Sequence, residues 1–112
     1  QWTSAVGTTV GGGAVTIATV ATATNTLYVV EAVFVGRRTD VAGTGAGYII
    51  NTTFRNIAGV LTRIGTQSKL AQEDVGAWDS NVNVSGTNIV FQVTGAGGST
   101  INWKVEYKIT VV

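Results

Sequence analysis

The chain has 112 residues, of which 45% are hydrophobic and 12% are charged, and its seven cations and six acids leave a net charge of +1. This length is enough for one domain with one core, and a nearly neutral chain with no cluster of cations beyond Arg37-Arg38 lacks the basic surface that binds DNA or RNA. Cysteine and histidine are absent, which excludes disulfides, thiolate metal sites and the usual general base at neutral pH. We therefore expect no metal, no other cofactor, no enzymatic activity and no nucleic-acid partner.

The sequence contains no apolar run that approaches the roughly 18 to 20 residues of a membrane-spanning helix, and its N-terminus lacks the pattern of a secretory signal. We expect no insertion into a membrane. The chain opens on glutamine rather than methionine, and we interpret it as a piece of a longer protein. Valine, threonine, isoleucine and glycine dominate the composition, which is typical of strands and tight turns.

The first predicted element is a short strand near residues 2 to 6, which is followed by the flexible Gly11-Gly12-Gly13. We expect residues 1 to 13 to form a lead-in strand and a glycine-rich linker, and residues 14 to 112 to form the β-sandwich domain. A second strand is predicted at residues 14 to 22, and Thr24-Asn25 predicts the turn that follows it.

A third strand is predicted at residues 26 to 38, and both of its alternating faces are apolar. A strand in a two-layer sandwich meets the core with one face only, so the second face needs another cover. We expect a neighbouring subunit to provide it, and the alternative is a loop of the same chain folded over the sheet. The side chains are Tyr28, Val30, Ala32 and Phe34 on one face, and Leu27, Val29, Val33 and Val35 on the other, which we assign to an oligomer interface.

The remaining segments predict an exposed loop, two hairpins and a last strand. Alternating glycines place the loop at residues 40 to 47. Strands at 48 to 57 and 60 to 70 pair through Ala58-Gly59, and strands at 78 to 84 and 88 to 94 pair through Ser85-Gly86. Residues 100 to 112 alternate apolar and polar side chains, which predicts one buried face containing Trp103 and Tyr107. About eight strands and no helix predict an all-β, antiparallel, jelly-roll-like sandwich.

Acidic residues gather between residues 73 and 79. Together with Asp40 they offer carboxylates of the kind that bind calcium or that act in pairs in glycosidases. Their spacing, however, matches no calcium loop, and one loop supplies no partner carboxylate across a cleft. We interpret them instead as members of structural ion pairs that fix a long connection to the end of the strand at 26 to 38. The side chains assigned to these pairs are Arg37, Arg38, Glu73, Asp74 and Asp79, with Glu73 or Asp74 expected to bind Arg37 or Arg38.

Aromatic and hydrogen-bonding side chains near the glycine loop are the candidates for ligand binding, because aromatic rings with a polar tip suit a partly wet contact surface. Tyr48 adjoins the loop and is expected at the surface. Trp78 is expected either to pack beneath the acidic segment or to bind a ligand. The candidate ligand-binding residues are Tyr48, Asp40, Thr44 and Trp78.

An ordered series of landmarks is spread over about two-thirds of the chain. It begins with Val33-Phe-Val-Gly-Arg-Arg-Thr-Asp40 and continues through Gly45-Ala-Gly-Tyr48, Thr53-Phe-Arg-Asn56, Glu73-Asp-Val-Gly-Ala-Trp-Asp79, Val84-Ser-Gly86, Val93-Thr-Gly95 and Thr100-Ile-Asn-Trp103. In these residues the chain resembles the small β-sandwich domain at the C-terminal end of many bacteriophage tail fibre, tailspike and related virion proteins. Residues 1 to 25 carry little of the resemblance.

The resemblance implies a virion structural domain that trimerises about a threefold axis and forms the distal part of a tail fibre or spike, where it recognises the host surface. It implies other virion proteins and a host-surface glycan or protein as partners, assembly in the host cytoplasm, and a location in the phage particle. Two alternatives remain open: a capsid-decoration or head/tail assembly protein without a cellular ligand, and a fragment of a carbohydrate-active enzyme.

Overall fold

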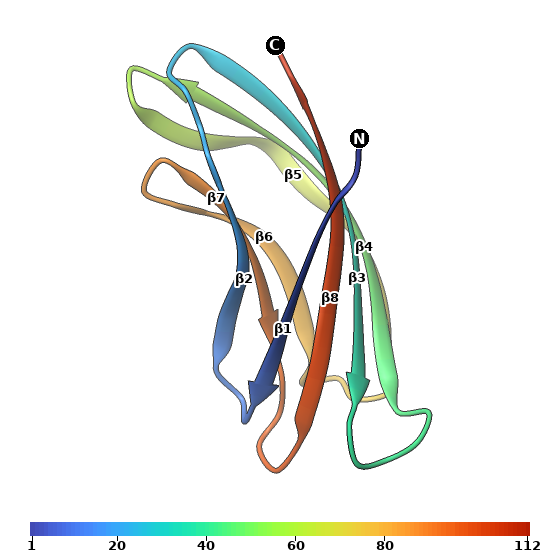
Figure 1. Ribbon diagram of the computed structural model, residues 1–112. Coiled ribbons are helices and arrows are strands. Elements are labelled where there is room, and N and C mark those ends of the chain that lie inside the picture. The colour runs from blue at the N-terminus through green and yellow to red at the C-terminus, as the bar shows by residue number, and fades with distance from the viewer.

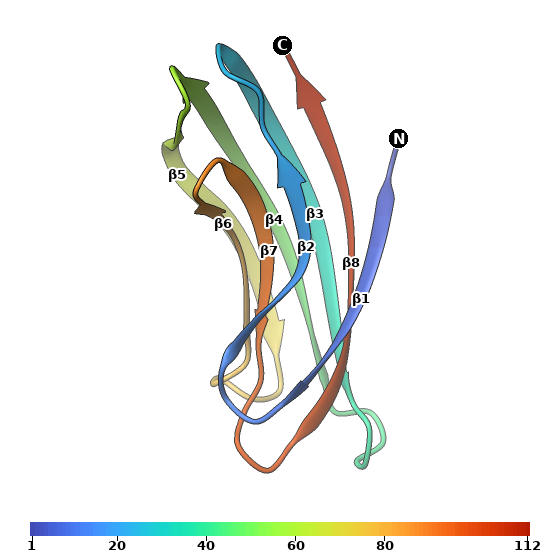
Figure 2. The same cartoon turned by 60° about the vertical axis from the view of Figure 1, so that its left-hand side comes forward.

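The computed structural model describes residues 1–112 as eight β-strands in two antiparallel sheets that pack face to face (Figures 1 and 2). One sheet has five strands in the order β1-β8-β3-β4-β5, and the other has three in the order β2-β7-β6. The predicted all-β sandwich of about eight strands is confirmed. The strands are β1 Thr3–Val10, β2 Ala14–Ala21, β3 Thr26–Arg38, β4 Gly45–Ile57, β5 Val60–Glu73, β6 Asp79–Ser85, β7 Asn88–Thr94 and β8 Thr100–Val111.

The N-terminal strand is longer than its sequence indicates. β1 pairs with β8 over its whole length, from Thr3 opposite Tyr107 to Val10 opposite Thr100. Residues 11 to 13 then cross from the large sheet to β2 in the small one (Figure 2). The residues that we expected to form a lead-in strand and linker therefore form an edge strand and one of the connections between the two sheets.

Local turn chemistry explains the two predicted hairpins, and both are present. β4 and β5 meet at Ala58 and Gly59, whose φ angles of 52° and 81° are those of a tight two-residue hairpin turn. β6 and β7 meet between Ser85 and Asn88, where Gly86 has a φ of 60°. Positive φ angles, which L-residues disfavour, thus occur in these turns at a glycine or at the residue next to one.

Trp103 lies at the centre of the contacts between aromatic side chains in the core. Its Nε1 donates a hydrogen bond to Thr9 Oγ1 at 2.9 Å, and both groups are buried. Its ring contacts Trp78 edge-on at 6.0 Å and Tyr48 at 6.3 Å between centroids. A Cβ on Gly36 would come within 2.6 Å of the ring, so glycine at that position makes room for the indole.

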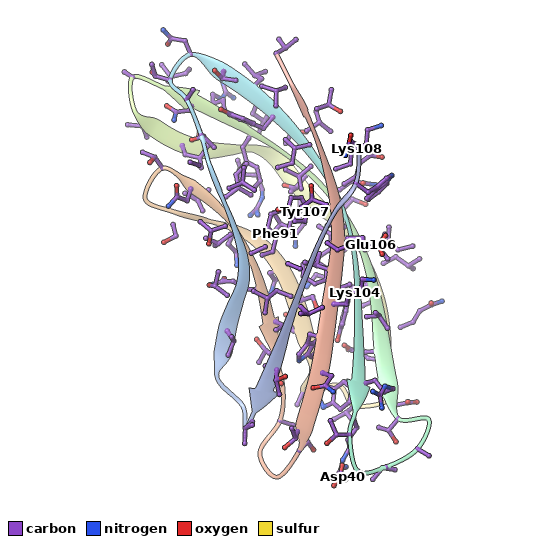
Figure 3. The ribbon with its side chains drawn as sticks, viewed as in Figure 1. Asp40, Phe91, Lys104, Glu106, Tyr107 and Lys108 are labelled. Carbon is purple, nitrogen blue, oxygen red and sulfur yellow. The ribbon has the colours of Figure 1, made fainter.

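β8 has the alternation that its sequence predicts. Trp103 is buried, whereas Lys104 and Glu106 point away from the core, as Figure 3 shows. Tyr107 is half-buried and stacks on Phe91 of the opposite sheet with 4.3 Å between ring centroids (Figure 3). The predicted placement of both aromatic residues toward the core is therefore confirmed.

Polar side chains join the two sheets along the edge formed by β5 and β6, which the sequence does not predict. Gln67 Oε1 accepts a hydrogen bond of 3.2 Å from the Val82 amide, and Arg63 donates one to the Val82 carbonyl. Lys69 Nζ lies 2.7 Å from Asp79 Oδ1. Backbone groups of the edge strand β6 are thus bound by side chains, which blocks them from pairing with another strand.

Candidate functional site: the outer face of the five-stranded sheet

The outer face of the five-stranded sheet is the side turned away from the three-stranded sheet, and it is apolar along β3. Leu27, Val29, Val33 and Val35 expose 47%, 43%, 43% and 51% of their surface, while the alternate residues of β3 are buried. The chain therefore does not cover this face, and the alternative in which one of its own loops folds over it is wrong. The assignment of these four side chains to an oligomer interface stays a prediction.

The apolar character of the outer face continues across the neighbouring strands. Val33 lies opposite Ile49 of β4, which in turn lies opposite Leu70 of β5. Ile49 and Leu70 are 49% and 55% exposed, so these three residues form an apolar row across the sheet. Exposed apolar side chains that gather in this way mark a contact surface, whereas scattered ones do not.

Charged side chains lie on the β8 side of this apolar area. Lys104, Glu106 and Lys108 project from β8 on the outer face (Figure 3). Lys104 Nζ and Glu106 Oε2 are 3.3 Å apart, and both side chains are about half exposed. An exposed pair of this kind contributes little to stability, roughly 0 to 1 kcal/mol, so its main effect is on the local charge.

A shallow hollow of about 510 Å³ lies on the outer face where β1, β8 and β3 run side by side, and we call it the Arg37 depression. Arg37 forms no ion pair within the chain. Beside it, Thr8 Oγ1 donates a hydrogen bond of 3.0 Å to Asn102 Oδ1. The residues that line the Arg37 depression are Val6, Gly7, Thr8, Val35, Arg37, Asn102, Trp103 and Lys104.

The expected pairing of Arg37 or Arg38 with Glu73 or Asp74 is not formed. Arg38 instead binds Asp40, with 2.7 Å between Nε and Oδ1, and this hydrogen bond lowers the pKa of the Asp40 carboxyl. Neighbouring residues of a strand point to opposite faces, so Arg37 lies on the outer face while Arg38 turns toward its own loop. The segment that contains the two acids lies across β4 from both arginines.

The acids of the segment 73 to 79 each have a different partner. Glu73 Oε2 accepts a hydrogen bond of 2.5 Å from the Tyr48 hydroxyl. Asp74 Oδ2 accepts one of 2.9 Å from the Gly45 amide. Asp79 pairs with Lys69; burial would raise the pKa of Asp79, but the hydrogen bonds that it accepts outweigh burial and lower it. The chain holds no group of three or more His, Cys, Asp or Glu side chains placed to share a metal ion.

Two of the predicted ligand-binding residues lie in the core. Tyr48 is 1% exposed, so its expected place at the surface is wrong; burial and the bond to Glu73 raise its pKa above the ordinary value. Trp78 is also 1% exposed and packs against Trp103, although its Nε1 has no acceptor in the chain. Of its two expected roles, the structure shows packing.

The other two predicted ligand-binding residues, Asp40 and Thr44, lie in the loop between β3 and β4. This loop covers residues 39 to 44 and is shorter than predicted, because β4 begins at Gly45. Asp40 is exposed at the end of the sandwich that lies far from both termini (Figures 1 and 3). Thr44 is half-buried, and its carbonyl accepts a hydrogen bond of 2.9 Å from the Arg38 amide.

None of the elements is a helix of the length and apolarity needed to cross a bilayer.

Comparisons with known proteins identify a shared fold. No protein-family model matches the chain, and no curated protein matches it by sequence. Among solved structures, the tailspike protein of Acinetobacter phage vB_ApiP_P1 is similar over 98% of this chain and 22% of its own, with 17% sequence identity and a TM-score of 0.52. The tailspike protein of Acinetobacter baumannii phage AM24 matches 96% of this chain and 26% of its own, with 12% identity and a TM-score of 0.44. The first of these similarities shows that the chain has the fold of a segment of that tailspike protein. The chain spans 22% and 26% of the length of the two matched chains.

Proposed function

We propose that this chain is a structural domain of a bacteriophage tail fibre or tailspike, and that it assembles as a homotrimer through the outer face of its five-stranded sheet. The exposed apolar row Val33, Ile49 and Leu70 is the observation that carries this proposal. The likeness of the fold to a tailspike segment supports it. In such a trimer the three outer faces turn toward a common axis that runs along the strands, and their apolar side chains leave water.

The dimensions of the sheet support association through this face. The domain measures 46 × 23 × 21 Å. A stable interface buries roughly 800 Å² on each partner, which a face 46 Å long and 23 Å wide can supply. Its valine, isoleucine and leucine side chains are the kind that make permanent interfaces more apolar than the remaining surface.

Host recognition is the second part of the proposal, and we assign it to the loop at residues 39 to 44. The loop lies at one end of the sandwich, whereas both termini lie toward the other end (Figure 1). A trimer whose axis runs along the strands leaves the end with this loop open to solvent. We propose no catalytic role, because Glu73, Asp74 and Asp79 each bind a different group of the chain.

Light scattering on the isolated domain tests the assembly. The wild-type chain should have three times the mass of the 11.6 kDa monomer. Val33→Lys places a charge in the apolar row and should give a monomer. Val41→Lys is the matched control, since Val41 is 42% exposed and Val33 43%, but Val41 lies in the 39 to 44 loop, beyond the end of the sheet. A monomeric wild type, or a trimeric Val33→Lys variant, would contradict the proposal.

Phage particles test the recognition. Particles that carry Asp40→Asn together with Val41→Lys should assemble normally and adsorb to host cells more weakly. Normal adsorption would show that the loop at residues 39 to 44 does not bind the host. Unstable particles would instead favour a role in capsid decoration or assembly.

A further inference from the structure

One row of residues crosses the whole five-stranded sheet near the end that carries the 39 to 44 loop. The register places Thr8 of β1 opposite Asn102 of β8, Asn102 opposite Arg37 of β3, and Arg37 opposite Gly45 of β4. The Asp74 amide continues the row by donating a hydrogen bond of 3.2 Å to the Gly45 carbonyl. Arg37 and Asp74 are therefore at the same height along the strands, with β4 between them.

Arg37 is a cation that lacks a partner. It lines the Arg37 depression, where the other cation, Lys104, already pairs with Glu106. The polar groups beside it, Thr8 and Asn102, bind each other. An arginine offers a planar, forked set of donors that matches a carboxylate, so the Arg37 depression is suited to receive one.

Asp74 is an acid with free capacity to bind. Its side chain is exposed, and it makes no ion pair within the chain. Its Oδ2 accepts the Gly45 amide, which fixes the carboxylate and leaves Oδ1 without a partner. Asp74 directly follows the last residue of β5, and its bond to the Gly45 amide holds the carboxylate at the β5 edge of the sheet.

We propose that Asp74 of one copy enters the Arg37 depression of the next copy and binds Arg37. Rotation about an axis parallel to the strands moves each residue sideways and leaves its height unchanged. The β5 edge of one copy then meets the β1, β8 and β3 side of its neighbour with Asp74 and Arg37 at matching heights. Such a contact is heterologous, and the threefold rotation of the proposed trimer repeats it around a closed ring. This inference rests on the proposed assembly and names the charged contact that orients it.

Charge reversal tests the contact in the isolated domain. Arg37→Glu and Asp74→Lys should each weaken association by about tenfold or more, because each replaces attraction with repulsion at the interface. The double variant Arg37→Glu with Asp74→Lys should recover most of the lost affinity. Asp74→Asn removes the charge but keeps an oxygen that accepts the Gly45 amide, so it should weaken association without disturbing the loop.

Arg55→Glu provides the specificity control. Arg55 is an exposed arginine of β4 that forms no ion pair and lies opposite Leu27, far along the sheet from the Arg37 row. Combining Arg55→Glu with Asp74→Lys should not recover the affinity that Asp74→Lys loses. Recovery by this pair would show that only the total charge matters, and it would overturn the contact.

The outcomes separate this contact from the assembly itself. A monomeric wild type overturns both. A trimer that Val33→Lys dissociates, but that both single charge reversals leave intact, confirms the apolar interface and refutes the contact between Arg37 and Asp74. Loss of association in each single variant, with recovery in the double variant, supports both the apolar interface and the contact between Arg37 and Asp74.

Discussion

Gly36 is the position in the core where one added carbon has the clearest expected cost. A Cβ there would lie 2.6, 2.7 and 2.9 Å from three ring carbons of Trp103. The ring cannot easily shift, because its Nε1 is hydrogen-bonded to Thr9 and the ring packs against Trp78. Overpacking of this kind costs roughly 1 to 3 kcal/mol. Gly36→Ala also removes freedom from the unfolded chain, which offsets about 0.4 to 1 kcal/mol of that cost.

Gly47 supplies the matched control for this substitution. Its nearest heavy atom to a new Cβ is the Phe34 carbonyl oxygen at 4.0 Å, so Gly47→Ala adds the same group without a clash. We expect Gly47→Ala to be neutral or slightly stabilising and Gly36→Ala to lower the free energy of unfolding relative to it by about 1 to 3 kcal/mol. Urea titration of both variants in the Val33→Lys background measures this without a contribution from association. Equal stability of the two variants would refute the packing argument.

Three further predictions concern single polar contacts. Because its folded pKa is lowered, Asp79 stabilises the fold above the ordinary pKa of 3.8 and loses this effect as the pH falls below it. Asp79→Asn should therefore unfold at a lower urea concentration than the wild type near neutral pH, and a difference between the two that persists in acid would contradict this. Tyr48 has a raised pKa, so its contribution is complete below pH 10.0 and is lost above it; alkaline titration should show stability falling less steeply in Tyr48→Phe, and identical profiles would oppose this. Gln67→Ala removes the acceptor of the Val82 amide, whose hydrogen exchange should accelerate; unchanged protection would show that Gln67 does not cover the edge of β6.

The features that follow from local rules could be predicted from the sequence. The alternation in β8 identified its buried face, and Ala58-Gly59 identified a hairpin. The two apolar faces of β3 predicted a strand whose second face needs a cover, and within the chain that face is exposed. These signals work because side-chain direction and turn geometry depend on neighbouring residues only.

The position of Tyr48 could not be read from its neighbours, because glycine has two uses that look alike in a sequence. We interpreted the alternating glycines as a loop, yet Gly45 already belongs to β4. A Cβ on Gly45 would lie 2.6 Å from the Gly36 carbonyl oxygen, so this glycine permits two strands to approach closely. With the strand beginning at Gly45, the alternation carries Tyr48 into the core.

The contacts between residues far apart in the sequence could not be predicted without the strand order. Arg38 and Asp40 are two residues apart and pair locally, whereas the position of Asp74 relative to Arg37 depends on β4 lying between their strands. The contacts of Arg63 and Gln67 with Val82 depend on how the two sheets align. The pairing of β4 with β5 shifts register beside Gly65, where φ is 69°. This glycine is the local signal in the sequence that the edge strand β5 is irregular.

The place of β8 between β1 and β3 has a consequence for how the chain folds. β8 is the last strand of the sequence, yet it joins the first strand to the rest of the large sheet. Until residues 100 to 111 have left the ribosome, β1 has no partner and one side of β3 remains open. Contacts between residues so far apart in the sequence form slowly, since a long loop must close first. The sandwich therefore closes only after synthesis of its final strand.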